Sequence, residues 1–315
     1  MAISREKAQT LAPLVVLAAL VLSIGLYDRT FLSIGNLLTI TSDTMTIFLI
    51  ASGVTFVIMI GGIDLSIQSV ASMTSCILAV NLPRLGFAAV PLAIFGGAVA
   101  GFLGGIVSTK LRIPSFIATL AVSGVVTSAG YWYSTERSID ISAKDSARNL
   151  SWAVGAIAGV PNEIWIGLVF LAILSALLGL TPFGRLVRGI GAQERAVMAS
   201  GIDVDRTKIA TYVLSGTMAG VAGVVMAARL GSGSPTLANE FLLPAIACIV
   251  VGGTAITGGV GSIWRTFVGA LIVQVVRIGM TYVGVSAFAQ QIVFGFLLVA
   301  AVAITMDRSK VAVIK

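Results

Sequence analysis

The chain has 315 residues, of which 57% are hydrophobic and 10% charged, and its mean hydropathy is +1.04. A water-soluble fold would have to hide too much apolar surface, which argues against a soluble enzyme or binding domain. Histidine, the commonest proton carrier and metal ligand, is absent. The net charge of +7 does not gather with aromatic residues in any polar segment, so no nucleic-acid partner is expected.

Apolar runs follow one another along nearly the whole chain, and runs of about 18 residues or more are typical of membrane-spanning helices. The first run follows Arg5 and Lys7 and lacks the cleavage site of a signal peptide, so we expect it to remain as a helix. The predicted fold class is all-α, a polytopic transmembrane helical bundle of about ten spans with broken helices, forming a single domain over 1–315. The expected spans are 11–27, 36–60, 65–82, 87–109, 113–134, 163–181, 208–230, 243–257, 264–284 and 287–306.

The placement of lysine and arginine orients this bundle. With ten spans and the N-terminus inside, thirteen of the 20 basic residues lie on the cytoplasmic side, six lie outside, and Arg277 lies within a span. This asymmetry agrees with the positive-inside rule and places both termini in the cytoplasm. The two longest polar stretches are then an outer loop at 135–162 and an inner loop at 182–207.

The segment GGIDLSIQS, residues 61–69, interrupts a hydrophobic run. Gly61 and Gly62 permit a non-helical turn. Asp64 or Ser66 then either caps the next helix or lines a polar route at membrane depth, where irregular backbone is tolerated only if protein or water satisfies it. The sequence leaves both roles open, and the two are compatible.

Arg277 lies near the middle of its expected span, one turn after Gln274. A charge at that depth is costly and usually faces the bundle interior, which favours a role in a polar pathway or in helix pairing. Asp43 and Glu240 are the candidate counter-charges, and sequence alone does not choose between them. The predicted pathway residues are Asp43, Asp64, Ser66, Gln274 and Arg277.

The sequence predicts no catalytic group, metal site or ATP site. The Gly-rich stretch GGTAITGGVGS at 252–262 lacks the Lys-Ser/Thr ending of a P-loop and is expected to form a tight turn. Cys76 and Cys248 lie in apolar runs, where thiols behave as small hydrophobic groups. The runs VTFVIMIGG (54–62) and AIACIVVGG (245–253) both end in Gly-Gly, as in transporters with broken helices or in simple Gly-rich turns.

The stretch GAQERAVMASGI, residues 191–202, is compact, charged and bracketed by glycines. Gly201 is well placed to end a short helix. Ala192, Ala196 and Ala199 share one face at i, i+4, i+7 spacing, which allows close packing. Such a helix either lies passively at the membrane face or docks a cytoplasmic partner.

Three segments, GAQERAVMASGI, GGIDLSIQS and LPAIACIVVGGTAITGGVGS, together resemble the signatures of ribose-type permeases of ATP-binding-cassette (ABC) importers. The likeness covers roughly 36–306, in the same order and at similar spacing. It departs from the family's pattern at Gln68, where Gly is more frequent. The resemblance implies that the first segment is a coupling helix seated in a groove of the ATPase. The residues predicted to couple to that ATPase are Gly191, Gln193, Glu194, Arg195, Ala196, Gly201 and Ile202.

The resemblance also implies partners: an ABC ATPase that binds ATP and magnesium, an extracytoplasmic sugar-binding protein, and a second permease copy, identical or paralogous. This chain would then bind no cofactor and would carry a sugar or polyol across the bacterial inner membrane. The scarcity of ionisable groups in the spans suits an uncharged cargo. Two alternatives stay open: a branched-chain amino-acid permease of the same superfamily and, in another class, an ion-coupled secondary transporter, which needs intramembrane carboxylates or histidines.

Overall fold

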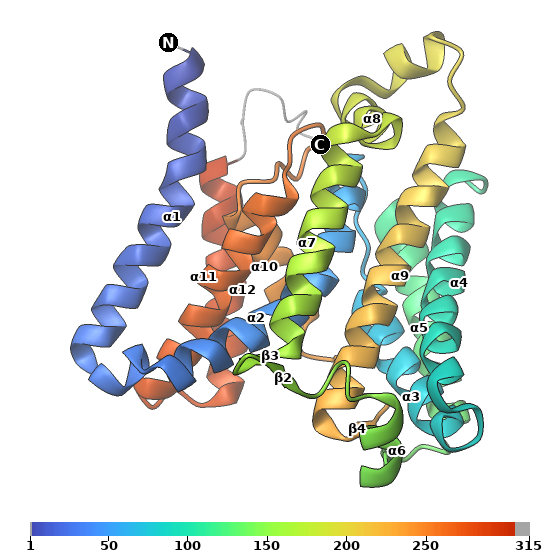
Figure 1. The fold of residues 1–315 in the computed structure, drawn as a ribbon. Helices are drawn as coiled ribbons and strands as arrows, with labels where there is room; N and C mark the ends of the chain where they lie inside the picture. Colours follow the sequence, from blue (N-terminus) through green and yellow to red (C-terminus); the bar gives the residue numbers. More distant parts are fainter. Residues whose placement is uncertain (1, 306–315) are drawn as a thin grey trace.

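The computed structural model describes the backbone of residues 2–305 and the side chains of residues 13–286 and 289–300. Helices dominate this part of the chain, and most of them lie side by side (Figure 1). The longer helices are α1 (Ala2–Tyr27), α2 (Ile34–Met59), α3 (Ile67–Leu85), α4 (Ala89–Thr109), α5 (Ser115–Ser134), α7 (Asn162–Leu180), α8 (Pro182–Ala199), α9 (Val204–Leu230), α10 (Leu242–Val251), α11 (Ile263–Tyr282) and α12 (Ala287–Thr305). The short elements are η1 (Arg29–Leu32), η2 (Gly86–Ala88), α6 (Ala143–Asn149) and two antiparallel pairs, β1 (Ile139–Asp140) with β4 (Ser232–Gly233) and β2 (Ala156–Ile157) with β3 (Val160–Pro161). The predicted all-α class is confirmed.

Each of the ten expected spans coincides with one helix. Six described stretches are long and apolar enough to cross a membrane, and one of them, Ile67–Thr109, holds both α3 and α4, which turn at Gly86 (φ +54°). Shorter apolar helical stretches occur in α1, α10 and α12. The expected outer loop holds α6 and the expected inner loop holds α8, at opposite ends of the bundle (Figure 1). The predicted cytoplasmic C-terminal segment, 306–315, lies outside the described residues.

One expected span is shorter than predicted. The run at 243–257 is helical only as far as Val251, the last residue of α10, and residues 252–262 are not helical. Gly253 adopts φ +85°, a left-handed conformation that glycine reaches without strain and that ends a helix. α10 therefore stops short, and a long irregular segment leads into α11.

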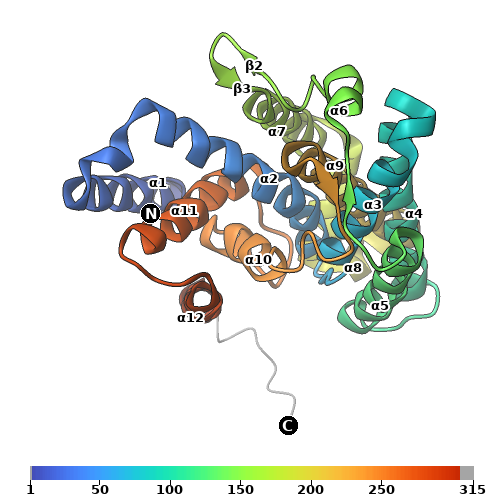
Figure 2. The same cartoon turned by 90° about the horizontal axis from the view of Figure 1, so that it is seen from below.

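Helix α2 forms the centre of the fold. Its residues from Thr44 to Met59 are all buried, and it contacts α7, α8, α9, α10 and α11. A helix that is apolar all round is typical of one surrounded by protein. Seen from below, α2 crosses the middle of the molecule, with α1, α10, α11 and α12 on one side and α3, α4, α5 and α9 on the other (Figure 2).

Helix α4 packs on α9 through a row of glycines. Gly97, Gly101 and Gly105 recur every four residues and face α9. A Cβ at Gly101 would overlap the carbonyl oxygen of Tyr212, and a Cβ at Gly97 would overlap that of Gly216. Lipid tails are as apolar as leucine, so such close approach of two backbones is a main source of attraction between membrane helices.

Gly101→Leu is therefore expected to separate α4 from α9 and to remove most of the folded protein. Overpacking costs roughly 1–3 kcal/mol even where neighbouring side chains can move aside. Here the neighbour is the backbone of Tyr212, which cannot move without shifting α9. The measurement is the yield of monodisperse protein after detergent extraction. Gly124→Leu is the matched control, because Gly124 is exposed on α5 with nothing within 4 Å of its Cβ position. Equal yields from the two variants would contradict this packing.

Candidate functional site

The predicted short helix at 192–200 is the second part of α8. Gln193 has extended backbone angles (φ −159°, ψ 83°), so α8 is broken there into two pieces. The second piece ends at Ala199, and Gly201 follows with φ +78°, the conformation expected of a glycine stop. The predicted C-terminal stop is confirmed, whereas the helix begins later than Ala192 because of the break.

The second part of α8 presents small side chains outward. Ala196 and Ala199 are both exposed; Ala192 is exposed too but precedes the break at Gln193, so the expected helical face of three alanines is reduced to two. Glu194 points to one side, where its carboxylate accepts a hydrogen bond from the Lys208 ammonium at 2.7 Å. Of the predicted coupling residues, Gln193, Arg195 and Ile202 are also exposed. The arrangement leaves a bare, small-residue face at one end of the bundle.

Gly191, in contrast, is packed against the bundle. A Cβ there would overlap the carbonyl oxygen of Met59, at the end of α2. The backbone N–H of Gly259 donates to that same oxygen at 2.8 Å. Gly258 lies beside the backbone of both Gly61 and Gly191. The end of α2, the middle of α8 and the loop after α10 thus meet in one contact, the glycine junction (Gly61, Gly191, Gly258 and Gly259).

The chain is irregular between the glycine junction and α3. Asp64 lies in this break and is only 2% exposed. Its carboxylate accepts hydrogen bonds from the backbone N–H of Ser66 at 3.0 Å, from the Ser66 hydroxyl at 2.6 Å and from the Ser215 hydroxyl at 2.8 Å. Ser66 is the N-cap residue of α3, but its side chain makes no capping bond. Of the two capping candidates, Asp64 therefore satisfies the backbone at this helix start.

Helix α5 covers the broken segment with a row of hydroxyl groups at four-residue spacing. The row consists of Ser115, Thr119, Ser123 and Thr127. Ser115 and Thr119 accept the backbone N–H groups of Ile63 and Leu65, each at 3.0 Å. The last two hydroxyls bond to Ser69 at 2.7 and 2.8 Å. These contacts satisfy the non-helical backbone that a membrane interior would otherwise leave unpaired. This row was not predicted, although its i, i+4 spacing is visible in the sequence.

Asp43 joins three helices near the end of the bundle that carries α6. Its carboxylate forms an ion pair with Arg229 of α9 and accepts a hydrogen bond from Gln274 Nε2 of α11 at 3.1 Å. Gln274 is 2% exposed, and its Oε1 has no hydrogen-bond partner among the described residues. Arg229 was not among the predicted pathway residues, yet it completes this polar cluster.

Neither candidate counter-charge, Asp43 or Glu240, pairs with Arg277 in the described part of the chain. Its guanidinium lies over the ring of Phe241, 5.7 Å from the ring centroid, in a cation–π contact. Asp43 pairs with Arg229 instead, and Glu240 is exposed and forms no ion pair in the described part of the chain. The predicted pathway residues thus fall into separate groups of contacts: Asp64 with Ser66, Asp43 with Gln274, and Arg277 with the aromatic ring.

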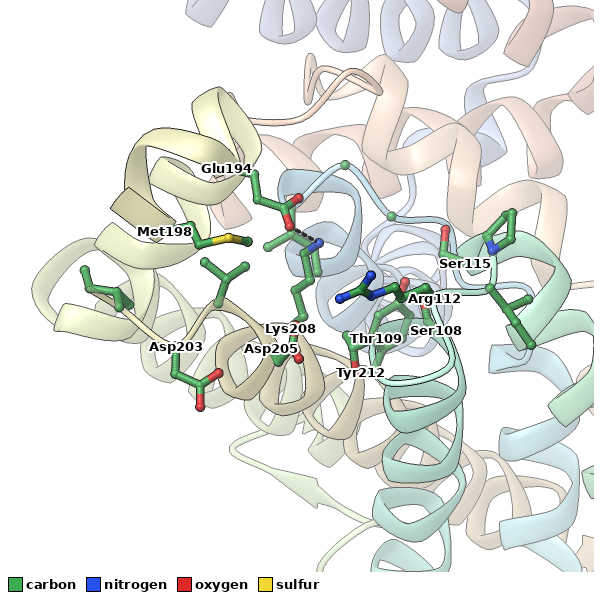
Figure 3. A pocket seen from close by; sticks show the side chains of 17 residues that line it. Ser108, Thr109, Arg112, Ser115, Glu194, Met198, Asp203, Asp205, Lys208 and Tyr212 are labelled. Carbon is green, nitrogen blue, oxygen red and sulfur yellow. Dashed lines mark hydrogen bonds and ion pairs between the residues drawn. The ribbon is translucent and has the colours of Figure 1, made fainter. Parts of the chain in front are cut away.

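A cavity of about 740 Å³ opens beside the second part of α8 (Figure 3). Its walls are the end of α2, the turn between α4 and α5, α8 and the start of α9. Glu194, Lys208, Arg112 and Tyr212 are among its lining residues, so the cavity connects the α8 region with the break that follows α2.

Next to this cavity, the Lys110 ammonium bonds the Asp205 carboxylate at 2.8 Å. That hydrogen bond, together with the charge of Asp205, raises the pKa of Lys110 above its ordinary value, so Lys110 stays cationic. The pair ties the α4–α5 turn to the start of α9. It therefore holds two walls of the cavity together.

Comparison with known proteins places this geometry in context. The family model described as branched-chain amino acid transport system / permease component matches residues 36–302, from near the start of α2 to near the end of α12. The ribose import permease protein RbsC of Haemophilus influenzae is 33% identical over 291 residues, 91% of this chain and 90% of that protein. RbsC of Bacillus subtilis is 35% identical over 309 residues, 96% and 94% of the two chains. The L-arabinose transport system permease protein AraH of Escherichia coli is 32% identical over 300 residues, 94% and 90%.

Proposed function

The chain belongs to the family of permease components of branched-chain amino acid transport systems, and on that premise we propose that it is the permease subunit of an ABC importer for a sugar. The observation that supports a sugar as the transported substrate is the similarity to relatives named for ribose or arabinose. They are 32–35% identical over more than nine tenths of this chain. The family description names branched-chain amino acids. The individual relatives match over nearly their whole chains, so their names are stronger evidence for the substrate class than the family description is.

The second part of α8 is the proposed contact with a separate ATPase. Its exposed alanines form a small face that can seat closely in a groove, and Arg195 beside them can add charge-assisted hydrogen bonds. The glycine junction connects this helix to the end of α2. Movement of the ATPase would therefore reach the broken segment that carries Asp64. The ATPase would bind ATP with magnesium, and this chain would bind neither.

The three groups of polar contacts in the bundle are the proposed lining of the sugar route. Asp43, Gln274 and Arg277 would line its outer part. Gln274 Oε1, which has no hydrogen-bond partner among the described residues, can accept a hydrogen bond from a sugar hydroxyl there. Asp64 and Ser66 would line its inner part. Specificity would rest largely with an extracytoplasmic sugar-binding protein, and a second permease copy, identical or paralogous, would complete the route.

The proposed topology is ten crossings of the bacterial inner membrane, with the N-terminus, α8 and the C-terminus in the cytoplasm. Cysteine labelling tests it, because both native cysteines are buried and give little background. In intact cells an impermeant thiol reagent is expected to label Ala147→Cys in α6 and to spare Ser200→Cys after α8. Ser309→Cys, in the C-terminal segment outside the described residues, should be spared as well. Labelling of Ser200→Cys or Ser309→Cys from outside would overturn the topology.

Asp64→Asn and Arg277→Ala are expected to lower transport more than assembly. Removing an arginine from a membrane-spanning helix eases insertion, by up to roughly 2.5–3.5 kcal/mol at the helix centre, so Arg277→Ala should still insert. Asparagine keeps the shape of Asp64 and removes its charge. The measurement is sugar uptake divided by the amount of folded permease in the membrane. Wild-type uptake by both variants would assign these residues a structural role alone.

Stimulation of the ATPase tests the substrate class. The permease, its ATPase and its binding protein are purified together, and ATP hydrolysis is measured with ribose, arabinose or leucine. We expect stimulation by a pentose and none by leucine. Stimulation by leucine alone would favour the amino-acid permease, and hydrolysis indifferent to all three would count against both cargoes.

A further inference from the structure

Arg112, in the turn between α4 and α5, has a backbone conformation that side chains rarely adopt. Its φ is +55°, in the left-handed region that favours glycine. The side chain lines the cavity beside α8, as that of Lys208 does (Figure 3). Backbone held in this way tends to occur where a protein positions a group for binding. The turn therefore holds a guanidinium at a cavity wall at some cost to the fold.

Among the described residues, Arg112 is also the cation of this cavity that has no carboxylate partner. Three ion pairs, each with an N–O distance of 2.7 or 2.8 Å, neutralise the other charged side chains in or beside the cavity: Lys208 with Glu194, Lys110 with Asp205, and Arg206 with Asp203. Arg112 forms no ion pair with any residue whose side chain the structure describes. An acidic group from outside the chain would complete the set.

We propose that this cavity receives an acidic side chain of the ATPase, whose carboxylate pairs with Arg112. The inference rests on the proposed function and adds a second contact to it: the ATPase groove receives α8, and the permease receives a side chain in return. Arginine suits this role because its planar guanidinium binds a carboxylate through two parallel hydrogen bonds. Ile113, Met198 and Ile202 line the same cavity and can pack on the methylene groups of a glutamate.

The charges of the cavity favour a protein carboxylate over a free anion. The other charged side chains of the cavity are already paired, so Arg112 can balance the single charge of a carboxylate but only part of the charge of an ion such as phosphate. A single carboxylate on a partner already docked at α8 meets Arg112 at a high effective concentration. The same cavity is lined by Gly61 and Gly62, so the inserted side chain would lie beside the broken segment.

The test is co-purification of the permease variants with the ATPase of its own transport system in detergent. Arg112→Glu is expected to lower the recovered ATPase by about tenfold or more, because it sets two carboxylates against each other. Arg112→Gly removes the guanidinium and suits the positive φ, so it should fold at least as well as the wild type and still lose ATPase. Arg112→Lys should retain part of the binding.

Arg185→Glu is the matched control, since Arg185 is exposed on the first part of α8 and does not line the cavity. An equal loss with Arg185→Glu would show general attraction of opposite charges and would overturn the pairing at Arg112. Full docking by Arg112→Gly, while Ala196→Trp still reduces it, would overturn this inference and leave the proposed function standing. Absence of ATPase with the wild-type chain would overturn both. Binding of inorganic phosphate to the permease alone, lost in Arg112→Gly, would make the cavity a free-anion site instead.

Discussion

Gly191→Val is expected to abolish ATP-driven sugar uptake while the ATPase stays bound. A Cβ at Gly191 would overlap the carbonyl oxygen of Met59, so the branched side chain must push α8 away from α2. The exposed alanine face of α8 is untouched by this change. Packed contacts shift between discrete arrangements rather than deforming smoothly, so a displaced glycine junction should disconnect ATPase movement from the bundle.

Two measurements on the same membranes check this result: uptake of labelled sugar, expected at background, and recovery of ATPase with the permease, expected at the wild-type level. Gly179→Val is the matched control, because Gly179 is exposed at the end of α7 and its Cβ position has nothing within 4 Å. Wild-type uptake by Gly191→Val would show that the glycine junction plays no part in coupling. Loss of uptake in both variants would point to a general defect in the membrane.

Ala196→Trp is expected to have the opposite profile, loss of the ATPase from an intact bundle. Ala196 is exposed on the small face of α8, so an indole there can point away from the bundle but blocks close seating in a partner groove. Truncating a well-packed interface residue costs about 1 kcal/mol, and up to several at hot spots, and a clash should cost at least as much. Recovery of the ATPase should therefore fall about fivefold or more.

Co-purification and substrate-stimulated ATP hydrolysis measure this loss. Ala147→Trp is the matched control, an exposed alanine on the short helix α6 at the other end of the bundle. Glu194→Arg should weaken docking as well, since it also breaks the bond to Lys208. If Ala196→Trp and Glu194→Arg both keep wild-type docking and stimulation, the second part of α8 is an ordinary surface helix.

The helices were predictable because of a single constraint. A membrane interior cannot solvate backbone polar groups, so long apolar runs must become helices, and the ten expected spans each coincide with one. Hydropathy alone misplaced the end of α10, although the Gly-rich turn expected at 252–262 begins where that helix stops. Alanine, isoleucine and threonine in 254–257 keep the apolar average high, while the left-handed turn at Gly253 ends the helix. The break of α8 at Gln193 has no equivalent signal in the sequence.

The sequence predicted which charged residues lie within the bundle more successfully than it predicted which residues they pair with. Asp43 and Arg277 were both expected to lie inside the bundle, but apolar helices carry little periodicity that would show which way each face points. The partner of Asp43 is Arg229, which the sequence places at a helix end, among the charges that set topology. The partner of Arg277 is the uncharged ring of Phe241, which a comparison of opposite charges in the sequence does not reveal. The short charged helix at the end of α8 was predictable because its charge and its bracketing glycines stand out from an apolar chain, whereas its contact with an ATPase stays a prediction.

Uptake into reconstituted vesicles tests the central claim most directly. The permease and its ATPase are placed in liposomes with ATP inside, and the sugar-binding protein loaded with labelled ribose is added outside. We predict uptake that requires ATP and the binding protein and that ionophores leave unchanged. Uptake driven by a proton or sodium gradient without ATP would contradict the account and make this chain a secondary transporter.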